Sequence, residues 1–311
     1  MYLHYVKYFN IDVFYLNVLS NTIELFTFNG CQPYSRFYLS RPLDNLADHV
    51  IIGASTNNPM VNEMNYPKLV FGEGNAKLDH LAEKYNTRVF TFSLMSGHTC
   101  PYAKDCHSKA VFDGIKWGIQ DGPHTQFRCF SASQEVLFPA VRESRIANGI
   151  ILEYAAMPNG VELAGELLIK NMPLKAGIVR IHVGGDFATQ AYFDAWCYVA
   201  NKMPHIKFYA YTKALPFWVK RIGKIPSNLV LTASYGGYRD DLIAKHNLRF
   251  AKVVLSEAEA EYLPIDHDDS HAVENGPSFA LLIHGVQPAG SEAGKAVREL
   301  NGKGSYAKVG A

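Results

Sequence analysis

The sequence has no long apolar run and no excess of charge of either sign. Its 311 residues contain no stretch of about 18 or more apolar residues, so we expect no membrane-spanning helix. The formal net charge of +1 lacks the basic excess that general nucleic-acid-binding proteins show. The first residues also lack a charged segment leading into an apolar core, so we expect no secretory signal.

Cysteine is scarce as well. Five cysteines in 311 residues are an odd and sparse set, which excludes a disulfide framework. Such a set fits a reducing compartment, where thiols serve as ligands or lie in the core. We therefore predict a cytoplasmic protein.

The first fifty residues differ from the rest of the chain. They are crowded with Tyr and Phe and show neither a helical nor a strand period, and residues 52–66 resemble a polar loop. We interpret residues 1–51 as an N-terminal appendage: either an upstream extension of the true reading frame or a β element packed on the main domain. Residues 52–311 are predicted to form one α/β barrel domain, with a cysteine-bearing insertion at about 94–132.

From residue 88 onward, strand-like runs alternate with helical segments. Strands are predicted at 88–93, 178–186, 207–213, 229–234, 249–256 and 278–285. Helical segments are predicted at 133–171, 188–202, 215–224, 238–246, 257–262 and 289–300. This alternation predicts βαβ units and a parallel sheet. The leading architecture is a partial or full TIM-like (β/α) barrel, and a doubly wound open sheet is the alternative.

Polar residues recur on one face of these strands. Arg180 and His182 alternate with apolar residues. The following strands repeat the pattern with Tyr209, Tyr211, Lys213, Thr232, Ser234, Lys252 and Ser256. A parallel strand buried on both faces should be almost continuously apolar. A ligand-lined barrel interior explains the pattern, and a solvent-facing side or an internally hydrogen-bonded core is the alternative.

Three cysteines lie in loop-like sequence after the first of these strands. The segment FSLMSGHTCPYAKDC contains Cys100 and Cys106, and TQFRCFSASQE contains Cys129. Thiolates suit iron–sulfur clusters, zinc and copper(I). Three thiolates would leave one iron of a [4Fe–4S] cluster open for a substrate or another ligand. We predict a cluster on these three residues.

Two alternatives to the cluster stay open. A zinc site would need a fourth ligand, for which the insertion offers His98, His107 and His124. The three residues could also be ordinary buried thiols. Cys197 lies in a predicted helix with an apolar face and is expected in the core, while Cys31 has no interpretation.

A glycine–glycine–acid turn ends the second of these strands. Gly184, Gly185 and Asp186 resemble the turn of radical S-adenosylmethionine enzymes, which contacts the amino group of the cofactor. This resemblance implies that the three residues bind a cofactor, whereas Asp186 could instead be a helix cap or turn residue. The compact C-x3-C-x2-C motif of those enzymes is missing, so S-adenosylmethionine is an open cofactor assignment.

Polar residues also stand at the ends of later strands. Lys213 is predicted either to meet an anionic substrate or the charge of the cluster, or to be a solvated residue of the rim. His267 and His271 lie among Asp266, Asp268 and Asp269. That run suggests a second metal or proton-transfer site, or simply an acidic, solvated loop. His284 is expected in the core.

Taken together, the two cysteine-bearing blocks and RIHVGGDFATQAYFDAW…FYAYTKALPFW resemble the phage family named after gene product 88. The resemblance runs from about residue 52 to the C-terminus. It implies a bacteriophage-encoded protein of the host cytoplasm, with a radical S-adenosylmethionine-like barrel and a cluster on the three cysteines.

Three functions follow as hypotheses. The first is a redox or radical enzyme that acts on a small molecule. The second is an electron-transfer or redox-sensing protein with a redox partner. The third is a zinc-stabilised module that binds host machinery.

Overall fold

The computed structural model describes residues 3–7, 12–18, 22–25, 35–38, 67–73 and 76–300. The chain divides into two compact units, Met1–Met64 and Asn65–Ala311. The first unit contains an antiparallel sheet in the order β1-β2-β3-β4, with bounds Leu3–Lys7, Asp12–Val18, Thr22–Leu25 and Ser35–Tyr38. The predicted boundary at residues 51 and 52 lies outside the described residues and stays a prediction.

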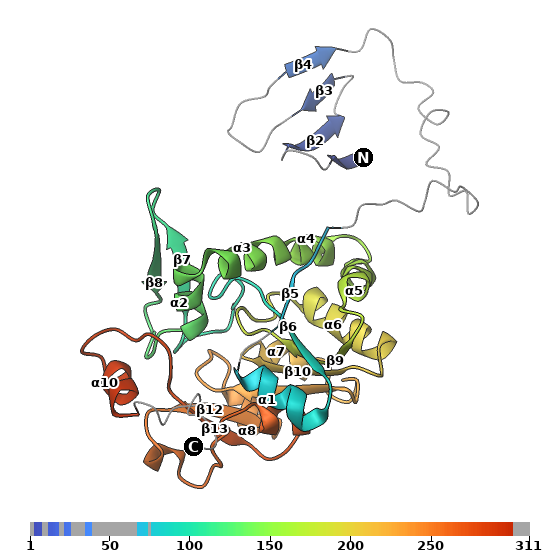
Figure 1. Cartoon of the computed structure of the whole chain (residues 1–311). Helices are drawn as coiled ribbons and strands as arrows, with labels where there is room; N and C mark the ends of the chain where they lie inside the picture. The colour runs from blue at the N-terminus through green and yellow to red at the C-terminus, as the bar shows by residue number, and fades with distance from the viewer. Residues whose placement is uncertain are drawn as a thin grey trace. The chain divides into compact units, whose positions relative to one another are not determined.

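The second unit is built on a seven-stranded sheet in the order β13-β12-β11-β10-β9-β6-β5 (Figure 1). The strands are β5 (Phe71–Gly72), β6 (Arg88–Phe92), β9 (Ala176–Ile181), β10 (Lys207–Thr212), β11 (Leu229–Ser234), β12 (Phe250–Val254) and β13 (Phe279–Leu282). All neighbours are parallel except β5 and β6. The predicted parallel α/β sheet is confirmed.

The prediction was a partial or full TIM-like barrel, and no closed barrel is observed among the described strands. The sheet is open, with β13 and β5 at its two edges. From β6 to β13 the parallel strands follow one another in chain order. A doubly wound sheet would instead reverse its strand order at a switch point. The described strands therefore form a singly wound, mostly parallel sheet.

Helices α4 (Ile150–Ala156), α5 (Gly160–Asn171) and α6 (Gln190–Lys202) cover one face of the sheet. Trp196 of α6 packs edge-on against Phe92 of β6, with ring centroids 5.5 Å apart. The large apolar side chains of this layer are buried, so most of the hydrophobic stabilisation of the unit lies here.

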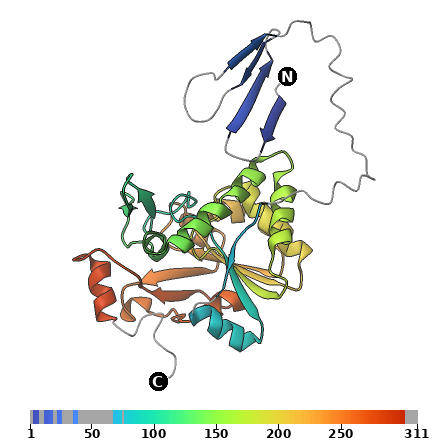
Figure 2. The ribbon, with the colours of Figure 1, turned by 45° about the horizontal axis from the view of Figure 1, so that its top comes forward.

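The opposite face is covered by α1 (Ala76–Tyr85) and α9 (Ser270–Glu274), neither of which the sequence pattern predicts. Leu78 and Leu81 of α1 and Val273 of α9 bury a second apolar cluster against the strands. Figure 2 shows α1, in cyan, on the other side of the sheet from the green and yellow helices. The two helices therefore leave the carboxyl ends of the strands uncovered on this face, which we call the inner face of the sheet.

The remaining elements connect the strands or lie in the insertion. They are β7 (Ser108–Phe112), β8 (Trp117–Asp121), α2 (Phe130–Leu137), α3 (Pro139–Asn148), α7 (Leu215–Val219), α8 (Asp241–Lys245), a 3-10 turn at Ala258–Ala260 and α10 (Glu292–Glu299). Strands β7 and β8 form an antiparallel hairpin between Cys106 and Cys129. This hairpin and α2 bring the end of the insertion back to the sheet.

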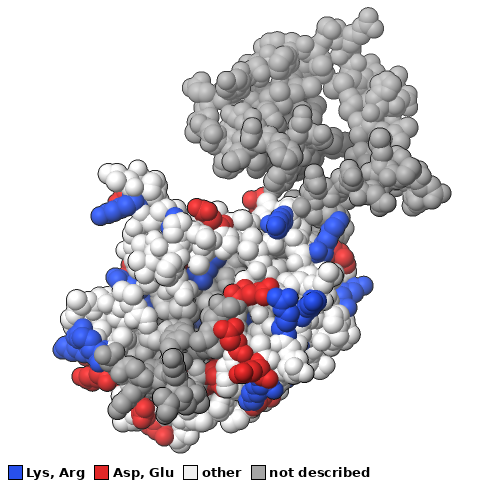
Figure 3. Space-filling view, in the orientation of Figure 1, with Lys and Arg blue, Asp and Glu red and all other residues white. Residues whose placement is uncertain are grey.

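The described surface carries charges of both signs. On the face drawn in Figure 3, Lys and Arg side chains are interspersed with Asp and Glu, as the net charge of +1 leads one to expect. None of the helices in the described part of the chain has the length and apolar character needed to cross a bilayer.

Candidate functional site

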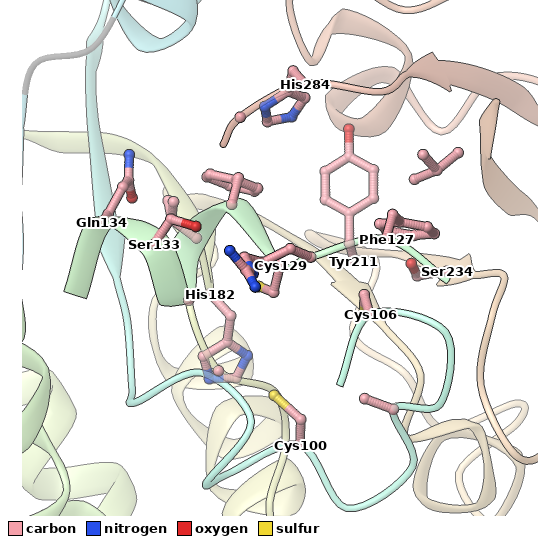
Figure 4. Close-up of a pocket in the computed structure, with 18 of the residues that line it drawn as sticks. Cys100, Cys106, Phe127, Cys129, Ser133, Gln134, His182, Tyr211, Ser234 and His284 are labelled. Atoms are coloured by element: carbon pink, nitrogen blue, oxygen red, sulfur yellow. The ribbon is translucent and has the colours of Figure 1, made fainter. Parts of the chain in front are cut away.

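A cavity of about 570 Å³ lies at the carboxyl ends of the parallel strands. Its volume is within the range of small-molecule and cofactor sites. All seven residues predicted as site residues line it: Cys100, Cys106, Cys129, Gly184, Gly185, Asp186 and Lys213. Figure 4 shows the three cysteines reaching it from the loop after β6 and from the start of α2.

Gly97 shapes the loop that carries Cys100. Its φ of +71° suits glycine, and a Cβ here would lie 2.4 Å from the carbonyl oxygen of Ser108. The Gly97 N–H donates to the Cys100 sulfur at 3.3 Å. The backbone of this turn therefore fixes the position of the Cys100 thiol.

Cys129 is the residue immediately before α2. Burial, followed by the nearby Cys106, raises its pKa to about 11, and the N–H groups of Ala132 and Ser131 partly offset the rise. Burial is also the main reason that the pKa of Cys100 lies well above its usual value, with further contributions from Asp186 and the other two cysteines. The three thiols are thus close enough for their charges to interact.

A buried ion pair fixes α2 against the Cys100 loop. Glu135 is fully buried, and its Oε1 accepts from the Ser96 N–H at 2.9 Å and the Ser96 hydroxyl at 2.8 Å. Arg145 donates to the same oxygen at 2.7 Å and to the Ser131 carbonyl at 3.1 Å. The segments that carry Cys100 and Cys129 are therefore joined through Glu135.

The two glycines after β9 allow close packing. A Cβ on Gly184 would lie 2.6 Å from the Ser131 hydroxyl and 2.7 Å from Nη1 of Arg145. A Cβ on Gly185 would lie 2.8 Å from that of Leu94, and its φ is +83°. Besides lining the cavity, both glycines therefore let β9 approach the cysteine-bearing segments.

Gly184→Ala is expected to destabilise the fold by roughly 1–3 kcal/mol, because the added methyl overpacks the contact with Arg145. The matched control is Gly118→Ala, since a Cβ at Gly118 would meet nothing within 4 Å. Urea unfolding of the two variants measures the difference. Equal urea midpoints for the two variants would show that Arg145 accommodates the added methyl group without loss of stability.

Asp186 joins the ends of β9 and β10. Its Oδ1 accepts from the Thr212 hydroxyl at 2.6 Å and the Phe187 N–H at 2.7 Å, and its Oδ2 accepts from the Lys213 N–H at 2.8 Å. Burial raises its pKa, although these hydrogen bonds and the Lys213 charge oppose the rise. Asp186 does not cap α6, because that position belongs to Thr189.

Lys213 is buried, so it is not a solvated residue of the rim. Its ammonium donates to the Ser234 hydroxyl at 2.6 Å and to the Tyr235 carbonyl at 2.6 Å. These bonds connect the end of β10 to the end of β11. The positive charge stays at the cavity wall beside Asp186.

His182 departs from the alternation that the sequence suggests. Its φ of +70° is unusual for a residue other than glycine. The ring packs against Phe187, and Nε2 lies 2.9 Å from the Tyr192 hydroxyl of α6. The imidazole therefore packs against the helical core next to α6, although His182 still borders the cavity.

The His182→Asn variant is expected to lose stability less steeply in acid than the wild type. Burial, followed by the Arg180 charge, lowers the pKa of His182 from 6.5 to about 3. Between these values the unfolded chain binds a proton that the folded chain does not, so stability falls with falling pH. The wild-type slope should exceed that of the variant by about 1.4 kcal/mol per pH unit. Urea unfolding from pH 6 to pH 4 tests this, and parallel slopes would refute it.

The inner face of the sheet carries a second ion pair, in which Asp269 is buried. Arg180 Nη1 lies 2.5 Å from Asp269 Oδ2, and both residues line the cavity. The Tyr209 and Tyr211 hydroxyls donate to Asp269 at 3.1 and 3.3 Å. Burial and then the Asp269 charge raise the pKa of Tyr211 well above its ordinary value. Asp269 is thus a site residue that sequence reasoning placed in an acidic loop.

Other predictions about polar residues have mixed outcomes. Arg180, Tyr211, Lys213 and Ser234 line the cavity as the strand pattern predicted. Lys252 is exposed, and Val253 faces the cavity in its place. Asp266 and Asp269 are buried, so the interpretation of their segment as a solvated loop is wrong. His284 follows β13 and lines the cavity, with its ring 4.6 Å from that of Phe130.

The residues considered as a fourth ligand lie elsewhere. His98 Nε2 is 2.8 Å from the Ala110 carbonyl, and His107 Nε2 is 3.1 Å from the Gly97 carbonyl. The ring of His124 packs edge-on against that of Tyr238. None of the three lines the cavity. Cys197 is buried in the helical core as predicted, and Cys31 lies outside the described residues.

The spacing of the thiols bears on what they could bind. Within the described ranges, no three His, Cys, Asp or Glu side chains are arranged to hold a metal ion. The thiolates of one zinc ion stand roughly 4 Å apart, because each Zn–S bond is about 2.3 Å. In an iron–sulfur cluster each thiolate binds a different iron, so the sulfurs need not converge on one point. The described side chains therefore form no single-ion site, and the cluster on the three cysteines stays a prediction.

A family model described as gene product 88 matches residues 68–300 of the chain. The chain belongs to the gene product 88 family. The family is associated with phages. All residues that line the cavity of this gene product 88 family member lie within the matched range. Comparison with curated proteins and with solved structures found no match.

Proposed function

We propose that this chain is an iron–sulfur protein in which Cys100, Cys106 and Cys129 hold a [4Fe–4S] cluster at one end of the cavity. The observation that carries the proposal is the meeting of three thiols, all from one insertion, at a single cavity. Burial and nearby negative charge raise the pKa of Cys100 and of Cys129, so a bound cation would stabilise the thiolate form of these two residues.

Zinc has less support. His98 and His107 are engaged with backbone carbonyls, and they do not line the cavity. A structural zinc site would need four protein ligands around one ion.

An enzyme is favoured over a simple electron carrier. The cavity extends beyond the thiols to Arg180, Tyr211 and the buried Asp269. A carrier needs no such space, whereas a substrate does. When bound, a cluster with three thiolate ligands would supply redox chemistry and one iron open to a substrate. Lys213 would hold positive charge near the thiols, and Arg180 would hold it in the part of the cavity beyond them.

We propose that the open, singly wound sheet is a partial barrel like that of radical S-adenosylmethionine enzymes. S-adenosylmethionine is the less supported part of the proposal. Its amino group would have to share the oxygens of Asp186 with Thr212, Phe187 and Lys213. The phage-associated family supports a phage-encoded protein, and action in the host cytoplasm is a further part of the proposal.

Anaerobic purification tests the cluster. We expect a brown protein with about four irons and four sulfides per chain. Stoichiometric zinc without sulfide would contradict the proposal. A change in the EPR signal of the reduced protein on addition of S-adenosylmethionine would identify a radical enzyme. An unchanged signal would exclude the radical function and retain the redox function.

A further inference from the structure

The two ends of the cavity differ in chemistry. The thiols, Asp186 and Lys213 stand at one end. Between α2 and the chain after β13, the wall is mostly apolar. It is formed by Phe127, Phe130, Leu137, Leu281, Ile283 and Val286, with Ser133 and Gln134 of α2 as polar members. Figure 4 shows Phe127, Tyr211 and His284 around this part of the cavity. A mostly apolar wall with few polar groups is typical of small-molecule sites.

This apolar end reaches the surface. The side chains of Leu137 and Val286 are 60% and 56% exposed, although both also line the cavity. Leu137 ends α2, and Val286 follows β13, which is an edge strand. The entrance to the cavity therefore lies at the β13 edge of the sheet, next to the end of α2.

The cations of the wall are already paired. Arg128 Nη2 lies 2.6 Å from Asp121, and Arg180 pairs with Asp269. The Lys213 ammonium donates to Ser234 and Tyr235, and its charge is near Asp186. Phosphates and carboxylates are recognised by cations that are available to them. Because these cations are engaged with other groups, we expect the cavity wall to bind a strongly anionic molecule weakly.

We propose that the apolar end of this cavity binds an uncharged organic molecule with a planar apolar body. The rings of Phe127, Phe130, Tyr211 and His284 offer faces and edges to such a body. This inference deepens the proposed function, because the molecule would lie in the same cavity as the three thiols and would be the substrate class of the site.

Fluorescence titration of the full chain with 1-aminoanthracene, an uncharged planar probe, tests the inference. We expect saturable binding at one site. Leu137→Asp and Val286→Asp should each weaken it by at least about tenfold, because each places a carboxylate at the apolar entrance. Both side chains are exposed, so these variants should fold. Leu174→Asp is the matched control, since Leu174 is fully exposed and does not line the cavity.

Equal affinity in all variants would overturn the inference, as would the lack of saturable binding. Tighter binding of the anionic probe 8-anilinonaphthalene-1-sulfonate at the same site would refute the charge argument. Iron and sulfide are measured on the same samples. Protein that loads iron but does not bind the probe refutes this inference alone, and protein that binds the probe without iron refutes the proposed cluster alone.

Discussion

Cys100→Ser, Cys106→Ser and Cys129→Ser are each expected to abolish or strongly reduce iron and sulfide loading. Each change removes one of the three thiols at the cavity and leaves a hydroxyl, which is a poor ligand for iron–sulfur clusters. Anaerobic iron and sulfide analysis, together with visible absorbance, measures the loss.

Cys197→Ser is the matched control for these variants. Cys197 lies in the helical core, where its pKa is raised to about 12, chiefly by burial. Loading should therefore stay at the wild-type value. Full loading in one of the three cavity variants would remove that residue from the proposed ligand set.

Breaking the Glu135–Arg145 pair is expected to destabilise the fold by about 3–5 kcal/mol, because removal of one partner leaves a buried charge uncompensated. The two side chains are 0% and 5% exposed. Glu135→Ala would also release Ser96 from α2, so cluster loading should fall together with stability. Urea unfolding of Glu135→Ala and Arg145→Ala provides the measurement.

The exposed pair of Arg239 and Asp241 provides a control, because it joins the same kinds of charged group at the surface. Arg239→Ala should leave the urea midpoint unchanged, because water screens exposed ion pairs. If the Glu135 and Arg145 variants moved the midpoint as little as this control, the join between α2 and the Cys100 loop would not be a structural constraint.

Much of the sheet can be predicted from the sequence. The predicted strand at 229–234 coincides with β11, and that at 207–213 exceeds β10 by one residue. These segments are rich in β-branched and aromatic residues and are separated by helical stretches, so local pattern decides their structure. The three cysteines could be found for a similar reason, because they lie in loop-like sequence that follows a strand with a clear pattern.

The inner face of the sheet could not be predicted in this way. Asp269 lies in an acidic run that is typical of a solvated loop, but it is buried against Arg180, which is 89 residues away and pairs with its charge. Helix α1 presents few apolar side chains, so its pattern is weak until Leu78 and Leu81 meet the strands. His182 follows the strand alternation in sequence, but its left-handed backbone turns the ring towards α6.

The position of the insertion has a consequence for synthesis. β6 and β9 are hydrogen-bonded neighbours, yet residues 93–175, with all three thiols, separate them in the chain. The ribosome therefore releases Cys100, Cys106 and Cys129 before any of the strands β9 to β13 exist. Until those strands emerge and pair, the nascent sulfurs stand open to metal donors and oxidants.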